Sequence, residues 1–324
     1  MLRKKQQRHW FEFSSMVALG LALFLLISFW HLRVNAAPPE NILAIAPTPA
    51  QFNWFQGAVL GLVQGLTEFI PISSTAHLKV IPVALGWQDP GVALTAVIQL
   101  GSIIAVLGYF WQDLQQVFGG AWQAWQQKDW QKQEWRIFWG IFWGTFPILG
   151  VGLLIKAFVP DYDESPLRSL PAIAIASIVM AVLLAAAERF PQHQRTFGQL
   201  SLKDGILMGC AQALAVIPGV SRSGSTITAG LFMNLDRATA ARFSFLLGIP
   251  AITIAGLVEL KSLLSDGLST VPPLTLITSL ISSAVFSYLA IAWLIQFLQK
   301  HQTWVFVWYR LAFGMIILAF TLLR

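Results

Sequence analysis

Six segments of the chain are apolar over a length that can cross a lipid bilayer. They are residues 92–111, 137–158, 170–187, 243–263, 273–298 and 304–323. A transmembrane helix needs about 20 predominantly apolar residues. Of the 324 residues, 56% are hydrophobic and 11% are charged, against about 25% charged in soluble domains. The sequence therefore predicts an all-α integral membrane protein with about six transmembrane helices.

Two further apolar segments, 57–85 and 205–233, are interrupted near their middle by proline, serine and threonine. The interruptions read PISST and IPGVSRSGST, and Pro71 and Pro218-Gly219 would end a helix there. A broken backbone is tolerated at membrane depth only where it is buried in protein or lines a wet cavity. Both segments are therefore predicted to be re-entrant helix pairs.

Loop charges predict the orientation. If the N-terminus is cytoplasmic and both broken segments return to the side they came from, most of the 21 Lys and Arg residues fall in cytoplasmic loops. The positive-inside rule favours that arrangement. Because these residues are scattered over short loops and do not gather on one domain, nucleic-acid binding is not expected.

The first fifty residues form a separate region. MLRKKQQRHW is a basic start, MVALGLALFLLISFW is an apolar run, and a small-residue cleavage site lies near Ala36. This order is typical of a signal peptide, although the run is also long enough to stay as an anchor helix. Residues 1–50 are predicted to be a signal peptide or anchor helix with a Pro-rich linker, and 51–324 a polytopic membrane domain.

A weak internal repeat appears when the chain is shifted by 148 residues, which aligns GAVLGLVQGLTEFIPISST with GILMGCAQALAVIPGVSRS. The identical pairs include Gly57 with Gly205, Gly61 with Gly209, Gln64 with Gln212, and Ser73 with Ser221. In the predicted topology the first broken segment enters from outside and the second from the cytoplasm. The two halves, about 54–190 and about 203–324, are therefore predicted to be inverted repeats, whose sites lie where broken helices meet.

That meeting would assemble a set of polar and ionisable residues. The first break supplies Gln64, Glu68, Ser73, Ser74, Thr75 and His77, and the second supplies Ser221, Arg222, Ser223, Ser225 and Thr226. Ionisable residues at membrane depth are functional candidates by default. The guanidinium of Arg222 suits phosphate oxygens, and a helix beginning after the second break would favour an anion.

Structural explanations exist beside the functional ones. Glu68 could serve only to neutralise Arg222. Ser74 and His77 share a helix face, as a nucleophile and its base would, but capping and an ordinary histidine hydrogen bond also explain them. Helix capping explains Ser221 or Ser223 equally well; it does not explain Arg222.

QGLTEFIPISSTAH and PGVSRSGST are similar to the two signature segments of the bacterial undecaprenyl-diphosphate phosphatase family, also known for bacitracin resistance. VIQLGSI at 97–103 resembles a third family segment, and the likeness covers most of residues 52–324. The resemblance implies removal of the terminal phosphate of a C55 polyprenyl diphosphate, which recycles the lipid carrier for cell-wall synthesis. It also implies a divalent cation, Mg²⁺ or Ca²⁺.

By position, the catalytic residues of that family fall on Glu68, Ser74, His77 and Arg222, with Glu68 as the metal ligand. Phosphate binding is expected from Gln64, Ser73, Thr75, Ser221, Ser223 and Thr226. Many members of the family carry glutamate where this chain has Gln64. Metal binding and proton transfer therefore depend more on Glu68 and His77.

The expected reaction is attack by Ser74 on the terminal phosphorus, with His77 handling the proton and Arg222 and the cation stabilising charge. A water activated by Glu68 is the alternative nucleophile. The alternative function is a polyprenyl-phosphate transporter, because inverted repeats with broken helices are typical of transporters. The expected setting is the inner (plasma) membrane, with the site open to the periplasmic side. The expected partners are the lipid substrate and the bilayer, and the sequence is compatible with a homodimer.

Overall fold

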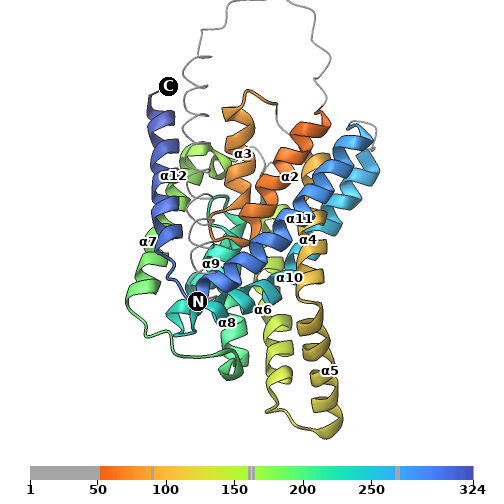
Figure 1. Cartoon of the computed structure of the whole chain (residues 1–324), viewed down its shortest axis with the longest axis vertical. Coiled ribbons are helices and arrows are strands. Elements are labelled where there is room, and N and C mark those ends of the chain that lie inside the picture. Colours follow the sequence, from red (N-terminus) through yellow and green to blue (C-terminus); the bar gives the residue numbers. More distant parts are fainter. Residues whose placement is uncertain (1–51, 89–90, 160–161, 163–164, 267–270, 324) are drawn as a thin grey trace, which may run out of the picture. The chain divides into compact units, whose positions relative to one another are not determined.

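The computed structural model describes residues 52–88, 91–159, 162, 165–266 and 271–323. Its named elements are all helices, as the sequence predicts (Figure 1). The chain divides into two compact units, and the larger one, Gln51–Leu78 with Pro90–Arg324, contains every candidate site residue. Among the described residues, the smaller unit includes residues 79–88. The predicted signal or anchor segment, 1–50, lies outside the described residues.

Five helices among the described residues are long and apolar enough to cross a membrane. They are α6 (Gln133–Phe158), α7 (Leu170–Arg189), α10 (Arg237–Asp266), α11 (Pro273–Leu298) and α12 (Trp304–Leu322). A sixth candidate is α4 (Gly91–Tyr109), which is followed after a 64° bend by α5 (Trp111–Gln127). The predicted six spans are confirmed if this bent pair counts as one, and the protein is a multi-pass membrane protein.

Both predicted helix breaks are present. The first lies between α2 (Trp54–Phe69) and α3 (Ser74–Ala84); the second lies between α8 (Leu202–Ala213), extended by η4 (Leu214–Val216), and α9 (Arg222–Phe232). Ile70 and Ile217, which precede the two prolines, are extended, with ψ of 138° and 118°. Proline disfavours the helical conformation in the residue before it, so each helix ends there.

The two breaks also share a backbone conformation. Ser73 and Ser221, which the 148-residue shift aligns, have φ of 76° and 72°. Positive φ is uncommon outside glycine, and here it turns the chain into the next helix. The inverted-repeat arrangement itself stays a prediction.

Close helix packing explains the glycines that the two broken segments share. α2 packs along α11, and α8 packs along α6 (Figure 1). A Cβ atom at Gly61 would lie 2.4 Å from the carbonyl oxygen of Ser279, and one at Gly209 would lie 2.1 Å from that of Gly144. Small residues let helix backbones approach closely in membranes. The repeated glycines therefore hold each broken segment against a long helix.

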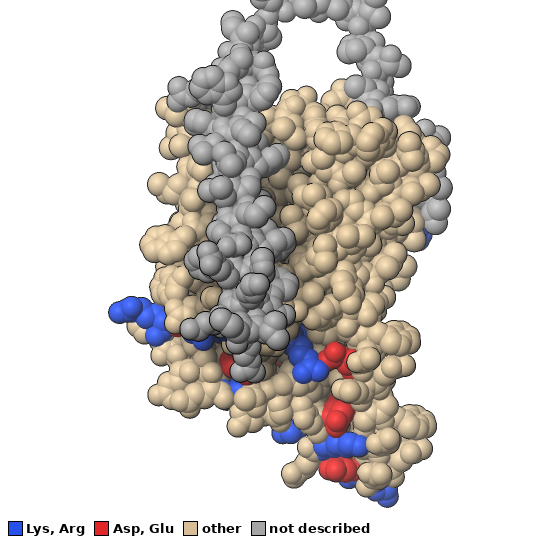
Figure 2. Space-filling model, in the orientation of Figure 1, with Lys and Arg blue, Asp and Glu red and all other residues tan. Residues whose placement is uncertain are grey.

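Charged side chains gather at one end of the face shown in Figure 2, over the ends of α5 and α6 and near the lower ends of α7 and α8. Above them the described surface is almost entirely uncharged. An uncharged band bounded by charge at one end is what burial in a bilayer requires, because ionisable groups are costly in hydrocarbon.

We expect Gly209→Ala to lower the thermal unfolding midpoint of the purified protein in detergent. The added methyl group would meet the backbone of α6, and overpacking of this kind costs about 1–3 kcal/mol. Gly150→Ala is the matched control, because a Cβ atom at Gly150 has no neighbour within 4 Å. The control should keep or raise the midpoint; equal midpoints for both variants would contradict the packing argument.

Candidate functional site

The two breaks meet, as the sequence predicts. The hydroxyl of Ser223 in the second break donates to the carbonyl oxygens of Glu68 (3.3 Å) and Ile70 (3.2 Å) in the first. The same two stretches of backbone are also joined through Arg310 on α12, which the sequence analysis did not single out. Residues separated by about half the chain thus form one buried polar region.

Arg310 satisfies the carbonyl groups that the breaks leave without helical partners. Its guanidinium donates to Pro71 O (3.0 Å) in the first break, and to Gly219 O (2.6 Å) and Val220 O (3.1 Å) in the second. Its Nε donates to Ser177 O on α7 (3.3 Å), and the residue is 1% exposed. Unpaired buried carbonyls destabilise a fold. Arg310 therefore fixes both breaks to α7 and α12.

The carboxylate of Glu68 lies at the centre of the candidate site. Ser74 Oγ donates to Glu68 Oε2 over 2.6 Å, and Gln64 Nε2 donates to the same oxygen over 3.0 Å. Arg222 Nη2 lies 3.6 Å from Glu68 Oε1. Ser74 and Arg222 are the first residues of α3 and α9, so two helix N-termini converge on one negative charge, which their dipoles stabilise.

Two guanidinium nitrogens of Arg222 have no hydrogen-bond partner in the structure. Its Nη1 donates weakly to Ser244 O at 3.5 Å, while Nε and Nη2 have no hydrogen-bond partner. The side chain is 9% exposed, and a Cβ atom at Gly248 would lie 1.6 Å from its Nη1. Glycine at that position therefore makes room for the guanidinium. Buried, unpartnered N–H groups on a permanent cation are ready donors for an anion.

His77 does not form the pair with Ser74 that its spacing suggests. Its Nδ1 donates to Ser73 O over 2.7 Å, since a carbonyl can only accept, and its Nε2 lies 2.6 Å from the hydroxyl of Tyr309. The ring stacks on Phe313 at 4.4 Å between centroids. Both ring nitrogens are thus engaged away from Ser74. In this structure Glu68 lies next to the serine proton, and His77 joins the first break to α12.

The remaining candidate residues have mainly structural contacts. Ser221 Oγ accepts from Gly224 N as the cap of α9, and Ser225 and Thr226 donate to Arg222 O. Thr75 is exposed in the first turn of α3. These contacts shape the start of α9 and hold Arg222 in place. Of these four residues, Thr75 is the one that is exposed.

Other polar residues of the site were missed at the sequence level. Gln99 Oε1 accepts from Gln64 Nε2 over 2.7 Å, and Ser244 lies against Thr226. A signal was available for Arg310 and Gln99, because each is a long polar side chain inside an apolar span. Tyr309 carried no such signal, since tyrosine is ordinary in membrane helices.

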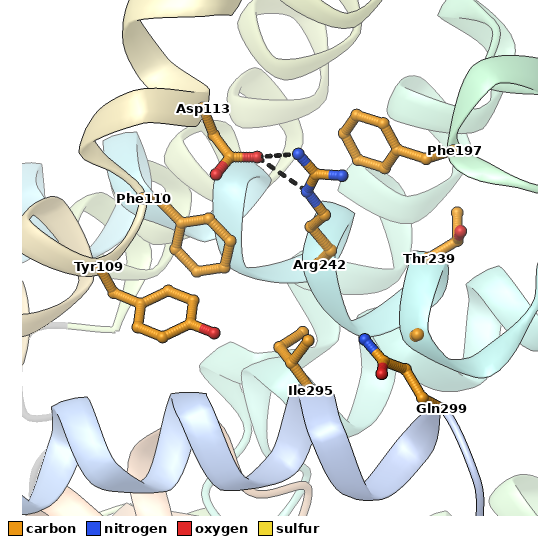
Figure 3. A pocket seen from close by; sticks show the side chains of 9 residues that line it. Tyr109, Phe110, Asp113, Phe197, Thr239, Arg242, Ile295 and Gln299 are labelled. Atoms are coloured by element: carbon orange, nitrogen blue, oxygen red, sulfur yellow. Dashed lines mark hydrogen bonds and ion pairs between the residues drawn. The ribbon is translucent and has the colours of Figure 1, made fainter.

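A separate cavity of about 280 Å³ contains none of these residues. It is lined by Tyr109, Phe110, Asp113, Phe197, Ala238, Thr239, Arg242, Ile295 and Gln299 (Figure 3). Asp113 accepts from Arg242 Nε over 2.8 Å, and the Arg242 guanidinium lies 4.1 Å from the ring centre of Phe197. Because Asp113 follows the bend between α4 and α5, this ion pair fastens the bend to α10.

The residues around Glu68 fit a cation that is shared with a phosphate group. The described part of the chain contains no cluster of three His, Cys, Asp or Glu side chains that could enclose a metal. Mg²⁺ is commonly held by one or two carboxylates together with substrate phosphates. Among the predicted site residues, Glu68 supplies the one carboxylate.

The fold and the site define a class: an all-helical, multi-pass membrane protein with serine, glutamate and arginine buried where two broken helices meet. A family model described as bacitracin resistance protein BacA matches residues 57–316. A Nostoc protein named undecaprenyl-diphosphatase is 58% identical over 312 residues, which are 96% of this chain and 95% of that protein. A Synechocystis protein of the same name is 65% identical over 266 residues, 82% of each. The chain belongs to the BacA family.

We expect Arg310→Lys to lower both the unfolding midpoint and the activity. A lysine ammonium has three donors and no planar fork, so it cannot reach the carbonyls of both breaks, and each buried group left unpaired costs about 1–3 kcal/mol. Arg189→Lys, at an exposed position at the end of α7, is the control. Calorimetry on both variants measures the effect, and unchanged melting of Arg310→Lys would refute the role.

Proposed function

We propose that this protein hydrolyses undecaprenyl diphosphate to undecaprenyl phosphate and inorganic phosphate. The observation that carries the proposal is the Ser74–Glu68–Arg222 group, in which a serine hydroxyl donates to a carboxylate beside an arginine with unpartnered N–H groups. A nucleophile, a proton acceptor and an anion-binding cation are what phosphoryl transfer requires. Membership of the BacA family and the names of its relatives support the choice of lipid.

In the first step Ser74 Oγ attacks the terminal phosphorus, and the bond from phosphorus to the bridging oxygen breaks. Glu68 accepts the serine proton and passes it to the departing undecaprenyl phosphate. In the second step water attacks the phosphoserine and gives a proton to Glu68, which returns it to Ser74 as the Oγ–P bond breaks. The 2.6 Å hydrogen bond supports Glu68 as this proton carrier.

Arg222 stabilises the charge on the transferring phosphoryl group through Nε and Nη2, with the N-termini of α3 and α9 adding favourable dipoles. His77 acts through its contacts: its hydrogen bond to Ser73 O holds the backbone from which Ser74 projects. Glu68 would be among the ligands of a divalent cation, Mg²⁺ or Ca²⁺, which would supply further charge neutralisation when bound.

The proposed setting is the inner (plasma) membrane of a bacterium, with the site open to the periplasmic side. The charge distribution of the loops supports this orientation. The product is the lipid carrier that cell-wall synthesis reuses. Membership of the family described as bacitracin resistance protein BacA supports a role in resistance to that antibiotic.

Purified protein should release phosphate from undecaprenyl diphosphate, and Ser74→Ala should abolish turnover and phosphoenzyme formation. The matched control is Thr321→Val, which removes a hydroxyl that is hydrogen-bonded within α12, to Leu318 O. Rapid quenching with substrate labelled at the terminal phosphate detects the phosphoserine. Near-normal turnover of Ser74→Ala would rule out the serine nucleophile and favour a water activated by Glu68.

If reconstituted protein moved the lipid across the bilayer without releasing phosphate, the transporter alternative would stand instead.

We expect Arg222→Lys to reduce kcat by about 100-fold to 1000-fold, the usual effect of removing a donor to a developing negative charge. A lysine keeps the charge but loses the two guanidinium nitrogens, Nε and Nη2, that have no hydrogen-bond partner in Arg222. Initial rates of phosphate release, compared with those of Arg189→Lys, measure the effect. A wild-type rate would show that the planar fork of Arg222 is not used.

A further inference from the structure

Glu259 is a carboxylate inside a membrane span that the reaction outlined above does not use. It lies on α10, between apolar neighbours Leu257 and Val258, which are exposed, and Leu260. Its Oε2 is buried and has no hydrogen-bond partner. An unpaired ionisable group within a span is expensive and is kept where it has a function.

The position of Glu259 on α10 directs it toward the site. Eleven residues, about three helical turns, separate it from Gly248, so both occupy one face of the helix. Gly248 faces Arg222, and a Cβ atom at Gly256, between the two, would lie 2.6 Å from Ile103 and 3.8 Å from Gln99 on α4. The same face of α10 therefore follows the site from Arg222 past Gln99 to Glu259.

The negative charges of Glu68 and Glu259 make this arrangement unfavourable unless a cation is bound. The face of α10 that carries Glu259 packs beside Gln99, which is hydrogen-bonded to Gln64, the partner of Glu68, so the two carboxylates border one buried region. Two negative charges in such a region repel each other. A diphosphate brought to Glu68 would add more negative charge, and such repulsion is strong in a medium of low dielectric constant. The side chain of Arg222, 9% exposed and with two unpartnered nitrogens, already faces Glu68. Glu68 thus has Arg222 as its cationic neighbour, whereas no ion pair is formed by Glu259 among the described residues.

We propose that Glu259 is a second carboxylate, beside Glu68, for a divalent cation bound together with the diphosphate. Gln64 is uncharged, so Glu259 would provide the second negatively charged oxygen ligand. The amide oxygen of Gln99 accepts a hydrogen bond from Gln64 Nε2 over 2.7 Å. It would be an uncharged metal ligand in the same region. Carboxylate and amide oxygens are the ligands that Mg²⁺ and Ca²⁺ prefer. The inference rests on the proposed function.

The test is direct Mn²⁺ binding to the full-length protein in detergent, without substrate and then with methylenediphosphonate. The paramagnetic resonance signal of free Mn²⁺ measures the bound fraction. We expect Glu259→Gln to weaken Mn²⁺ binding at least tenfold. Asp129→Asn, which removes an exposed carboxylate beside the α5–α6 turn, should bind as the wild type does. Equal affinity of Glu259→Gln and wild type, with and without methylenediphosphonate, would overturn the proposal.

Thermal unfolding separates this role from a structural one. Without a cation, Glu259→Gln should be at least as stable as the wild type, because it removes the charge of a buried carboxylate whose Oε2 has no hydrogen-bond partner. With saturating Mn²⁺ the wild-type midpoint should rise, since a ligand of the native state stabilises it, and the variant should gain less. A variant that is destabilised without the cation and gains as much from Mn²⁺ would instead make Glu259 structural.

Phosphate release distinguishes failure of this inference from failure of the proposed function. Active wild-type protein whose Mn²⁺ affinity is unaffected by Glu259→Gln would overturn the inference alone. Mn²⁺ binding that depends on Glu259, in a protein that releases no phosphate from undecaprenyl diphosphate, would keep the cation site and refute the phosphatase.

Discussion

The structure depends on how two interrupted helices satisfy their backbone inside a membrane. A helix that stops at membrane depth leaves carbonyl groups without partners, and hydrocarbon offers none. Arg310 supplies them for both breaks at once, with donors to Pro71 O, Gly219 O and Val220 O. Ser223 adds bonds to the backbone of the first break. These contacts hold the two broken segments together.

The chemistry of the site follows from that junction. Because the breaks meet, the first residues of α3 and α9, Ser74 and Arg222, both reach the carboxylate of Glu68. Two helix N-termini and a guanidinium then create a positive environment at the end of α2. The same packing that satisfies the backbone therefore prepares a buried place for an anion. His77 contributes to it by holding Ser73 and Tyr309 together.

Long helices position this junction. α2 approaches α11 through glycines, as α8 approaches α6, and Gly248 of α10 leaves the space that the Arg222 guanidinium fills. The residues that the 148-residue shift aligns thus recur in equivalent tasks: glycines at close helix contacts, and serines with positive φ at the start of the second helix. α10 then continues from Gly248 toward Glu259, the carboxylate proposed as a second ligand for a cation.

The sequence by itself determined the membrane class, the two breaks and the residues at them, because apolar length and proline act locally. It also placed Glu68, Ser74 and Arg222 at one meeting point and suggested Glu68 and Arg222 as a charge pair, because ionisable groups in a span need partners. It could not assign their contacts: spacing suggested His77 beside Ser74, whereas the fold pairs Ser74 with Glu68 and turns His77 toward Tyr309, 232 positions along the chain. Only the tertiary structure decided which partner each polar group found, since a buried hydrogen bond depends on distance in space and not on separation in sequence.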